Sequence, residues 1–346
     1  MAFLGRLQYN QTYREYCALL PIFFMEAFVM SHVSEHLKTL VKLNGFALGV
    51  MHISNKCINS YATGKNLLKP GGGKEFNWRN DYIFYHKYGN GDPVILLHDL
   101  DPAFSSYEWN EAVDELCSSR TVYSVDLPGC GRSSKPKKTF TNNDYVQFLT
   151  EFIKGVVKET CTVIASGYSS SFALVAAVSH PNMIGQVIAI NPRGLHDLMQ
   201  TSSGRSKAAA TLISLPIIGT SVYNMSESKG NIDLRFTEKY FYNPFHSKTR
   251  YIDAFYESAH YNESRGKYLM ASIEGKTTTV DITAALKETG EKLVILYGEK
   301  AENADRIAES YQKINPSVQA YPIAGTGSLP QLESPAKFVS ALAEVW

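Results

Sequence analysis

The sequence predicts an α/β protein with a doubly wound, mostly parallel sheet, a helical cap insertion and an N-terminal helical extension. From residue 93 onward, short continuous apolar runs such as 93–98 (PVILLH) and 293–297 (LVILY) alternate with amphipathic stretches. Such runs are typical of parallel strands that are buried on both faces. Between residues 191 and 292 the alternation stops, and a segment rich in Tyr and Phe with helical character replaces it.

Length and composition fit one large domain with an insertion. The chain has 346 residues, 44% of them hydrophobic and 19% charged, and a formal net charge of +1. This balance gives no reason to expect nucleic acid as a partner. The five cysteines are dispersed without metal-ligand or disulfide spacing, which predicts reduced thiols in a cytoplasmic compartment. No phosphate-binding glycine loop follows a strand, so we expect neither a metal nor a cofactor.

The first 72 residues depart from this pattern. Residues 17–30 are strongly apolar but are interrupted by Pro21 and Glu26, and a second apolar run covers residues 43–53. Both runs are shorter than the about 20 residues that a membrane-spanning helix needs. One interpretation is peripheral contact with a membrane through residues 14–55. The plainer alternative is a helical extension that packs on the domain.

The remaining elements follow from periodicity and from turn residues. A glycine-rich turn at residues 70–73 precedes the first of them. The expected strands are 76–79, 82–88, 93–98, 120–125, 162–165, 186–190, 293–297 and 318–323. The expected helices are 107–117, 143–157, 170–180, 302–314 and 335–346. These elements divide the chain into an extension (1–72), a first core segment (73–196), a helical cap (197–285) and a second core segment (286–346).

Four segments, in order, resemble the α/β-hydrolase superfamily. They are His98-Asp99 after the third strand, the strand–turn–helix at 162–177, residues 325–335 near the end, and the motif D-x-P-G-x-G-x-S at 126–133, which is the most specific. Together they cover residues 75–346 and are most similar to the branch with a helical cap, namely epoxide hydrolases, haloalkane dehalogenases and peptidases. The resemblance implies the α/β-hydrolase fold.

The chemistry of this family requires a nucleophile on a strand-to-helix elbow, an acid and a histidine. The residues that flank these three positions in the family place them at Gly167, Ala301 and Ser328 of this sequence. Glycine and alanine lack reactive side chains, and serine does not accept a proton near pH 7 as imidazole does. Glycine does tolerate the positive φ of the elbow. The resemblance therefore predicts a degenerate catalytic triad, with a displaced acid among Glu299, Glu302 and Asp305 as an open alternative.

The backbone of the family's oxyanion site is expected to persist, because it does not depend on the lost side chains. Its donors would be the N–H groups of Leu100 and Tyr168. We therefore expect a pocket for a small molecule that carries a carbonyl or a carboxylate. Asp99 would oppose an anion if its side chain pointed inward, and His260, in the cap, is expected to face the ligand.

The enzyme alternative is a serine hydrolase of esterase type with Ser169 as its nucleophile, in a G-x-S-x-S arrangement at 167–171. It requires a new base from among His98, His180, His196, His246 and His260. The plainer interpretation is that these serines cap the following helix. Another reaction on the same scaffold, such as that of a cofactor-free lyase, also remains open. Plant hormone receptors that resemble hydrolases provide an analogy for a retained pocket without the triad.

Overall fold

The computed structural model describes residues 35–68 and 71–346, so the apolar run at 17–30 lies outside the described residues. The chain divides into two units, residues 1–53 and 54–346. Helix α2 (Glu35–Ala62) begins in the first unit and contains the second apolar run. Among the described residues no single helix is long and apolar enough to cross a membrane. One bent pair, residues 204–214 and 217–240 at 104°, meets that test of length and composition only when taken together.

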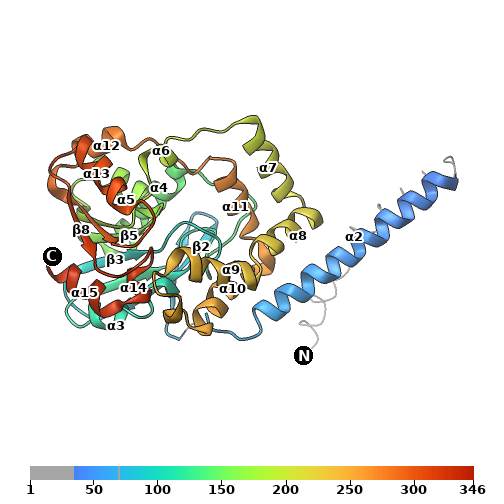
Figure 1. The fold of residues 1–346 in the computed structure, drawn as a ribbon, viewed down its shortest axis with the longest axis horizontal. Coiled ribbons are helices and arrows are strands. Elements are labelled where there is room, and N and C mark those ends of the chain that lie inside the picture. Colours follow the sequence, from blue (N-terminus) through green and yellow to red (C-terminus); the bar gives the residue numbers. More distant parts are fainter. Residues whose placement is uncertain (1–34, 69–70) are drawn as a thin grey trace, which may run out of the picture. The chain divides into compact units, whose positions relative to one another are not determined.

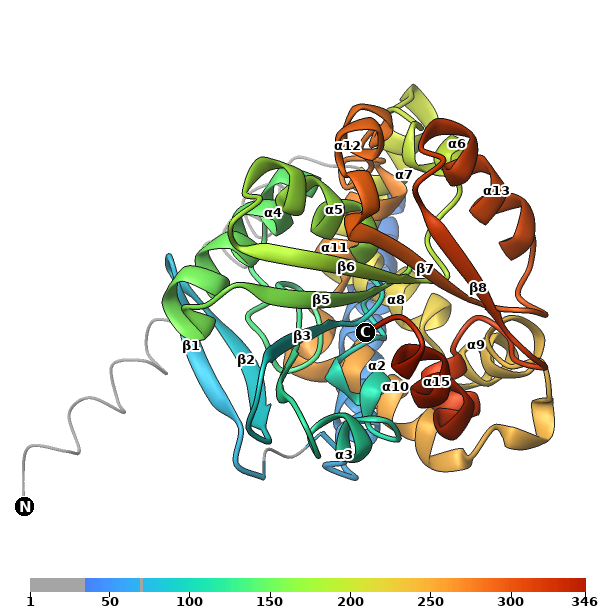
Figure 2. The same ribbon diagram turned by 90° about the vertical axis from the view of Figure 1, so that its left-hand side faces the viewer.

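The second unit is built on an eight-stranded sheet of order β1-β2-β4-β3-β5-β6-β7-β8 (Figure 2). The pairs β1–β2 and β2–β4 are antiparallel, and the remaining pairs are parallel. The predicted fold class is thus confirmed. The strands are β1 (Lys74–Trp78), β2 (Asp81–Tyr88), β3 (Pro93–Leu97), β4 (Thr121–Val125), β5 (Cys161–Ser166), β6 (Ile184–Ile190), β7 (Leu293–Gly298) and β8 (Gln319–Ile323).

The apolar runs became buried strands because both faces of the sheet are covered. Successive side chains of a strand point to opposite faces. In β3, Ile95 and Leu97 join one core cluster and Val94 and Leu96 join the other. The first cluster is covered by α4 (Asn142–Phe152), α5 (Ser169–Ser179), α12 (Thr283–Glu288) and α13 (Ala304–Ile314). The second is covered by η1 (Ser106–Trp109), α3 (Val113–Leu116) and α15 (Pro335–Ala343).

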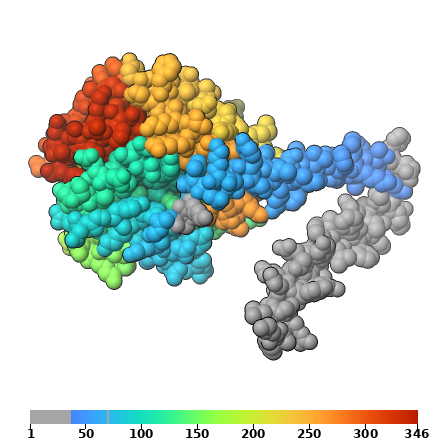
Figure 3. All heavy atoms as spheres, turned by 90° about the horizontal axis from the view of Figure 1, so that it is seen from below, coloured from blue at the N-terminus to red at the C-terminus, as the bar shows by residue number. Residues whose placement is uncertain are grey.

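One expected helix is divided in the structure, and another is preceded by a short additional helix. The predicted helix at 107–117 consists of the 3₁₀ turn η1 and the short helix α3. The closing helix is preceded by α14 (Pro330–Glu333). Figure 3 shows the C-terminal segment, in red, against the green-cyan segment that contains η1. This contact places Gln331 of α14 beside Glu108 of η1, which matters for the site described below.

Helices fill the interval between β6 and β7, as the aromatic-rich segment predicts (Figure 1). Their aromatic side chains pack mainly on one another, and Phe236, for example, contacts the rings of Tyr251 and Phe255. The last residues of α2 pack here too, since Asn55 donates to the carbonyl of Ile217. Before α12 and the turn η5 (Gly290–Lys292), the segment comprises α6 (Leu195–Leu198), α7 (Gly204–Ser214), α8 (Ile217–Ser226), α9 (Lys229–Arg235), the turns η3 (Phe236–Tyr240) and η4 (Pro244–His246), α10 (Thr249–Ser264) and α11 (Lys267–Glu274).

Candidate ligand site at the carboxyl edge of the sheet

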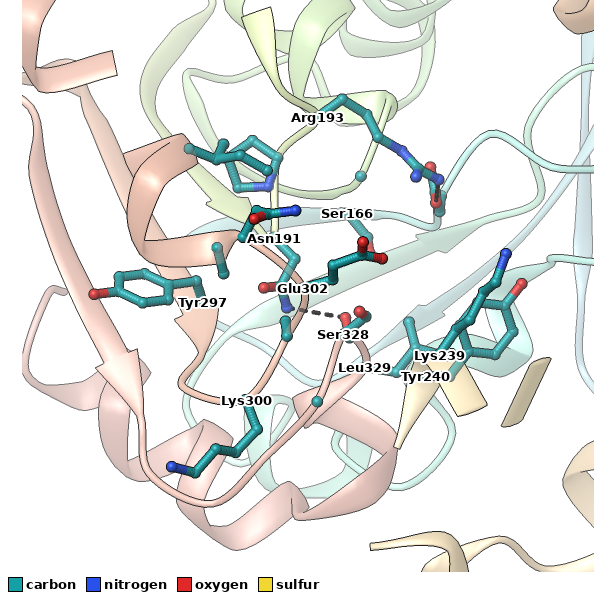
Figure 4. Close-up of a pocket in the computed structure, with 18 of the residues that line it drawn as sticks. Ser166, Asn191, Arg193, Lys239, Tyr240, Tyr297, Lys300, Glu302, Ser328 and Leu329 are labelled. Atoms are coloured by element: carbon teal, nitrogen blue, oxygen red, sulfur yellow. Dashed lines mark hydrogen bonds and ion pairs between the residues drawn. The ribbon is translucent and has the colours of Figure 1, made fainter. Parts of the chain in front are cut away.

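A cavity of about 560 Å³ lies at the carboxyl ends of the parallel strands, where open α/β sheets bind their ligands. Gly167 follows β5, Ala301 follows β7 and Ser328 follows β8, and all three line this cavity. The structure therefore brings together the three positions that the family resemblance singles out. Figure 4 shows Arg193, Glu302 and Ser328, from three different segments, around the same space.

The elbow between β5 and α5 has the backbone that the family requires but no room for a nucleophile. Gly167 has a φ of +53°, in the left-handed region that favours glycine. A Cβ atom added to Gly167 would lie 2.2 Å from both Cγ and Oδ1 of Asp99. The carboxyl group of Asp99, which follows β3, thus fills the space that a nucleophilic side chain would occupy.

The same carboxyl group engages both expected backbone donors. The N–H of Leu100 and the N–H of Tyr168 each donate to Oδ1 of Asp99 at 2.8 Å. Two converging N–H groups of this kind are how an oxyanion site holds a developing negative charge. In this structure the negative charge is supplied by the chain itself, so the site is occupied from within. The N–H groups of Leu100 and Tyr168 thus converge on the Asp99 side chain, which lines the cavity.

Arg193 holds the second oxygen of this carboxylate. Its Nη2 lies 2.6 Å from Oδ2 of Asp99, and its guanidinium lies 4.8 Å from the ring centre of Tyr168. The nearby Asp99 carboxylate raises the pKa of Arg193 above its ordinary value. Sequence reasoning missed this arginine. The available signal was its position just after β6, at the edge of the sheet where the other site residues lie.

Below Asp99 lies a second, fully buried carboxyl group. Oε2 of Glu108 accepts the backbone N–H of Asp99 at 2.9 Å, and its Oε1 accepts the Gln331 amide at 2.5 Å. Burial, together with the negative charge of Asp99, raises the pKa of Glu108 to about 8. Glu108 is therefore mostly neutral at pH 7, and it fixes the backbone from which the Asp99 side chain projects.

The raised pKa of Glu108 predicts a loss of stability between pH 7 and 8. The folded protein binds this proton more tightly than the unfolded chain, so the free energy of unfolding falls as pH rises toward the folded pKa of about 8. One pH unit in this window corresponds to about 1 kcal/mol. Glu108→Gln keeps an acceptor for Asp99 without the titration, and we expect its urea-unfolding free energy to change less between the two pH values. Equal pH slopes in the two proteins would contradict this assignment.

Ser169 does not meet a base. Its side chain is fully buried, and its hydroxyl donates to the backbone carbonyl of His98 at 2.5 Å. The imidazole of His98 is engaged elsewhere: Nε2 accepts the N–H of Leu127 at 3.0 Å, which leaves the proton on Nδ1, 2.8 Å from the Asp99 carbonyl oxygen. Burial lowers the pKa of His98. Across residues 35–68 and 71–346, no imidazole nitrogen is hydrogen-bonded to the Ser169 hydroxyl.

His260 lies apart from this cavity, contrary to the prediction that it faces the ligand. It is fully buried in α10, with Nδ1 2.9 Å from the carbonyl oxygen of Tyr256. Its ring packs against the rings of Tyr223 and Tyr256, and burial lowers its pKa to about 4. The physical reason is that the aromatic cap residues form their own core, which encloses this histidine.

The remaining lining combines charges of both signs with aromatic rings. The displaced-acid candidates separate here: Glu302 lines the cavity, whereas Glu299 accepts the backbone N–H of Gly325 at 2.9 Å. Of the residues that the structure describes, no histidine lines the cavity, and no group of three His, Cys, Asp or Glu side chains could hold a metal. The other ionisable or aromatic side chains that line it are Lys239, Lys300, Asp197, Glu238, Phe104, Tyr240, Phe241, Tyr242 and Tyr297.

Asn191 links the strand ends around the cavity. Its Nδ2 donates to the carbonyl oxygen of Ser328 at 2.9 Å, shown as a dashed line in Figure 4. Its Oδ1 accepts the N–H of Gly298 at 3.1 Å. The segment that carries Ser328 is thereby tied to the ends of β6 and β7, which gives this wall of the cavity a fixed shape.

Most of the chain matches a known protein family, and shorter segments resemble individual proteins. Residues 94–341 match the model of the alpha/beta hydrolase family. The human protein named 1-acylglycerol-3-phosphate O-acyltransferase ABHD5 is 29% identical over 118 residues, 32% of each chain. A haloalkane dehalogenase of Agrobacterium fabrum is 27% identical over 106 residues, which is 31% of this chain and 34% of the dehalogenase. These matches span about a third of the length of the curated relatives.

Solved structures share the fold at low identity. A serine hydrolase involved in carbazole degradation, the CarC enzyme, has a TM-score of 0.64 at 16% identity, covering 79% of this chain and 97% of its own. Cfl2 of Burkholderia cenocepacia has a TM-score of 0.63 at 14% identity, with 79% and 95% covered. At these identities the likeness establishes the fold alone.

Proposed function

Because the chain belongs to the alpha/beta hydrolase family, we propose that it is a catalytically degenerate member that retains a pocket for a small carbonyl- or carboxylate-bearing ligand. The observation that carries this proposal is the position of Asp99. Its carboxylate lies where a nucleophilic side chain would stand and accepts both backbone donors of the oxyanion site. A substrate carbonyl would find those donors already engaged and no group positioned to attack it.

The cavity itself supports a binding role. A volume of about 560 Å³ lies within the range of small-molecule sites. Arg193, whose side chain is 43% exposed, offers a planar guanidinium suited to a carboxylate. In this proposal the ligand's carboxylate or carbonyl approaches Arg193 first. It reaches the N–H groups of Leu100 and Tyr168 only when the Asp99 side chain turns away.

The serine-hydrolase alternative receives less support from the geometry. It needs the Ser169 hydroxyl to face the cavity and to meet a base. The hydroxyl instead donates to the backbone oxygen of His98 and is fully buried. This bond joins the start of α5 to the backbone that follows β3, and the hydroxyl does not cap α5.

A fluorophosphonate probe and short-chain aryl esters test the proposal directly. We expect neither labelling nor turnover above the rate without protein, for the full chain and for its matched control Ser169→Ala alike. Small carboxylic acids or their esters are expected to raise the melting temperature in a concentration-dependent way, because a ligand that binds only the folded state stabilises it. Labelling or turnover that disappears in Ser169→Ala would instead establish the hydrolase.

Peripheral membrane contact through residues 14–55 is a second proposal. Its support from the described residues is the apolar surface of α2, where Leu43, Phe46 and Ile53 are 63%, 72% and 64% exposed. Amphipathic or apolar helices of this kind bind at the lipid–water interface. Hydrogen exchange in the presence of vesicles, read from peptides of residues 35–55, would report this contact.

A further inference from the structure

The turn between α7 and α8, residues 212–218, forms an exposed apolar corner, which we call the α7–α8 corner. Leu212, Leu215 and Ile218 are 44%, 39% and 40% exposed. The sequence has no charged residue from 208 to 226. The exposed side chains of this stretch are therefore all uncharged, whereas exposed helices normally carry charged side chains on their outer face.

Three carbonyl groups of the α7–α8 corner are hydrogen-bonded from the protein side. Helix ends leave carbonyl groups without partners. Lys267, only 5% exposed, donates to the carbonyl oxygens of Leu215 and Pro216 at 2.7 and 3.0 Å. Asn55 donates to the carbonyl oxygen of Ile217 at 3.2 Å. These carbonyl groups do not depend on water, which is the condition for backbone to approach hydrocarbon.

Basic side chains lie at a suitable distance behind the corner. Lys207 precedes Leu215 by two turns of α7, which is about 12 Å along the helix axis. Apolar groups at a membrane interface are buried about 5–10 Å deep, so Lys207 stands at headgroup level when the α7 axis lies along the membrane normal. Lys207 also lines a groove of about 500 Å³ together with Lys137 and Lys138. Arg205 and Lys137 are likewise exposed.

From these observations we propose that the α7–α8 corner docks on a lipid bilayer that contains anionic lipids. Leu212, Leu215 and Ile218 enter the boundary of the acyl chains, while Lys207 and Lys137 face the anionic headgroups. The proposal concerns the folded hydrolase-like unit, residues 54–346, and depends neither on membrane contact by residues 14–55 nor on the proposed function of the cavity. It selects a membrane over a second copy of the chain because the corner is flanked by positive charge, which another positive patch would repel.

Vesicle co-sedimentation of the full chain tests this docking. We expect binding to vesicles of phosphatidylcholine with about one third phosphatidylglycerol, and weaker binding to phosphatidylcholine alone. Leu215→Asp with Ile218→Asp is expected to weaken binding at least tenfold. The matched control Phe245→Asp removes an apolar side chain that is 93% exposed on η4, and it should bind like the unmodified chain. Unchanged melting temperatures show that the variants remain folded.

Hydrogen exchange separates this surface from any other contact with the vesicles. The expected result is slower exchange across residues 208–226 with anionic vesicles, absent in the double Asp variant. Lys207→Glu with Arg205→Glu should weaken binding to the anionic vesicles and leave binding to the neutral ones unchanged. Three outcomes would overturn the proposal: no vesicle binding, unchanged protection of residues 208–226 by vesicles in the double Asp variant, or protection of residues 208–226 by self-association without lipid.

Discussion

Asp99→Ala is expected to lower the free energy of unfolding by about 2–4 kcal/mol and to create a site that small carboxylates refill. The substitution leaves the N–H groups of Leu100 and Tyr168 without their acceptor, and each unsatisfied buried donor costs about 1–3 kcal/mol. Loss of the ion pair with Arg193 adds less, because that side chain is 43% exposed. Urea unfolding measures the loss.

Acetate or formate should restore part of this stability. Either anion can place one oxygen between the two N–H groups and the other beside Arg193, as the Asp99 carboxylate does. At ten times its dissociation constant, such a ligand contributes about 1.4 kcal/mol. The unmodified protein should respond less, because its own carboxylate competes for the same donors. Sodium chloride at equal ionic strength controls for screening.

Asp99→Asn is the matched variant for this experiment. Its amide oxygen has the shape to accept both backbone N–H groups, whereas the negative charge opposite Arg193 is lost. We expect a smaller loss of stability than in Asp99→Ala and little response to acetate. If Asp99→Ala proved neutral, or if acetate stabilised all three proteins equally, the carboxylate would not be the internal occupant of the oxyanion site.

The strands of the core could be predicted from the sequence because a strand that is buried on both faces consists almost entirely of apolar residues. A run such as 293–297 is apolar on both faces, and only a doubly covered strand buries both. The predicted helix at 107–117 was less accurate, since η1 and α3 divide it. The apolar residues of this segment have the spacing of one helix, and two short helical turns show the same spacing.

The site was only half predictable for a related reason. Gly167, Ala301 and Ser328 could be placed because flanking residues fix their frame along the chain. The direction of the Asp99 side chain could not be predicted, because it depends on two N–H donors that follow different strands. His260 was misplaced because an aromatic, helical segment can line a pocket or pack on itself, and composition is the same in both cases.

Gly167→Ser is expected to lower the stability of the protein, because the Asp99 carboxylate occupies the space of the new side chain. The new side chain needs a φ of +53°, which costs a residue with a Cβ atom about 1–2 kcal/mol. Its Cβ atom would also lie 2.2 Å from Cγ of Asp99, so one of the two side chains must move. In the Asp99→Ala background the collision disappears. The two substitutions should therefore couple by about 2–3 kcal/mol, with the double variant more stable than the sum of the single losses predicts.

The same reasoning sets the order in which activity could be rebuilt. Gly167→Ser, Ala301→Asp and Ser328→His return the residue types that the family's chemistry needs. With Asp99 intact, the two N–H donors stay engaged, and we expect no aryl-ester turnover. Adding Asp99→Ala frees the donors, and a single donor of an oxyanion site contributes about 10²–10³-fold to the rate. Turnover by the triple variant with Asp99 intact would show that the carboxylate leaves the site readily, and that the missing side chains alone account for the loss of catalysis.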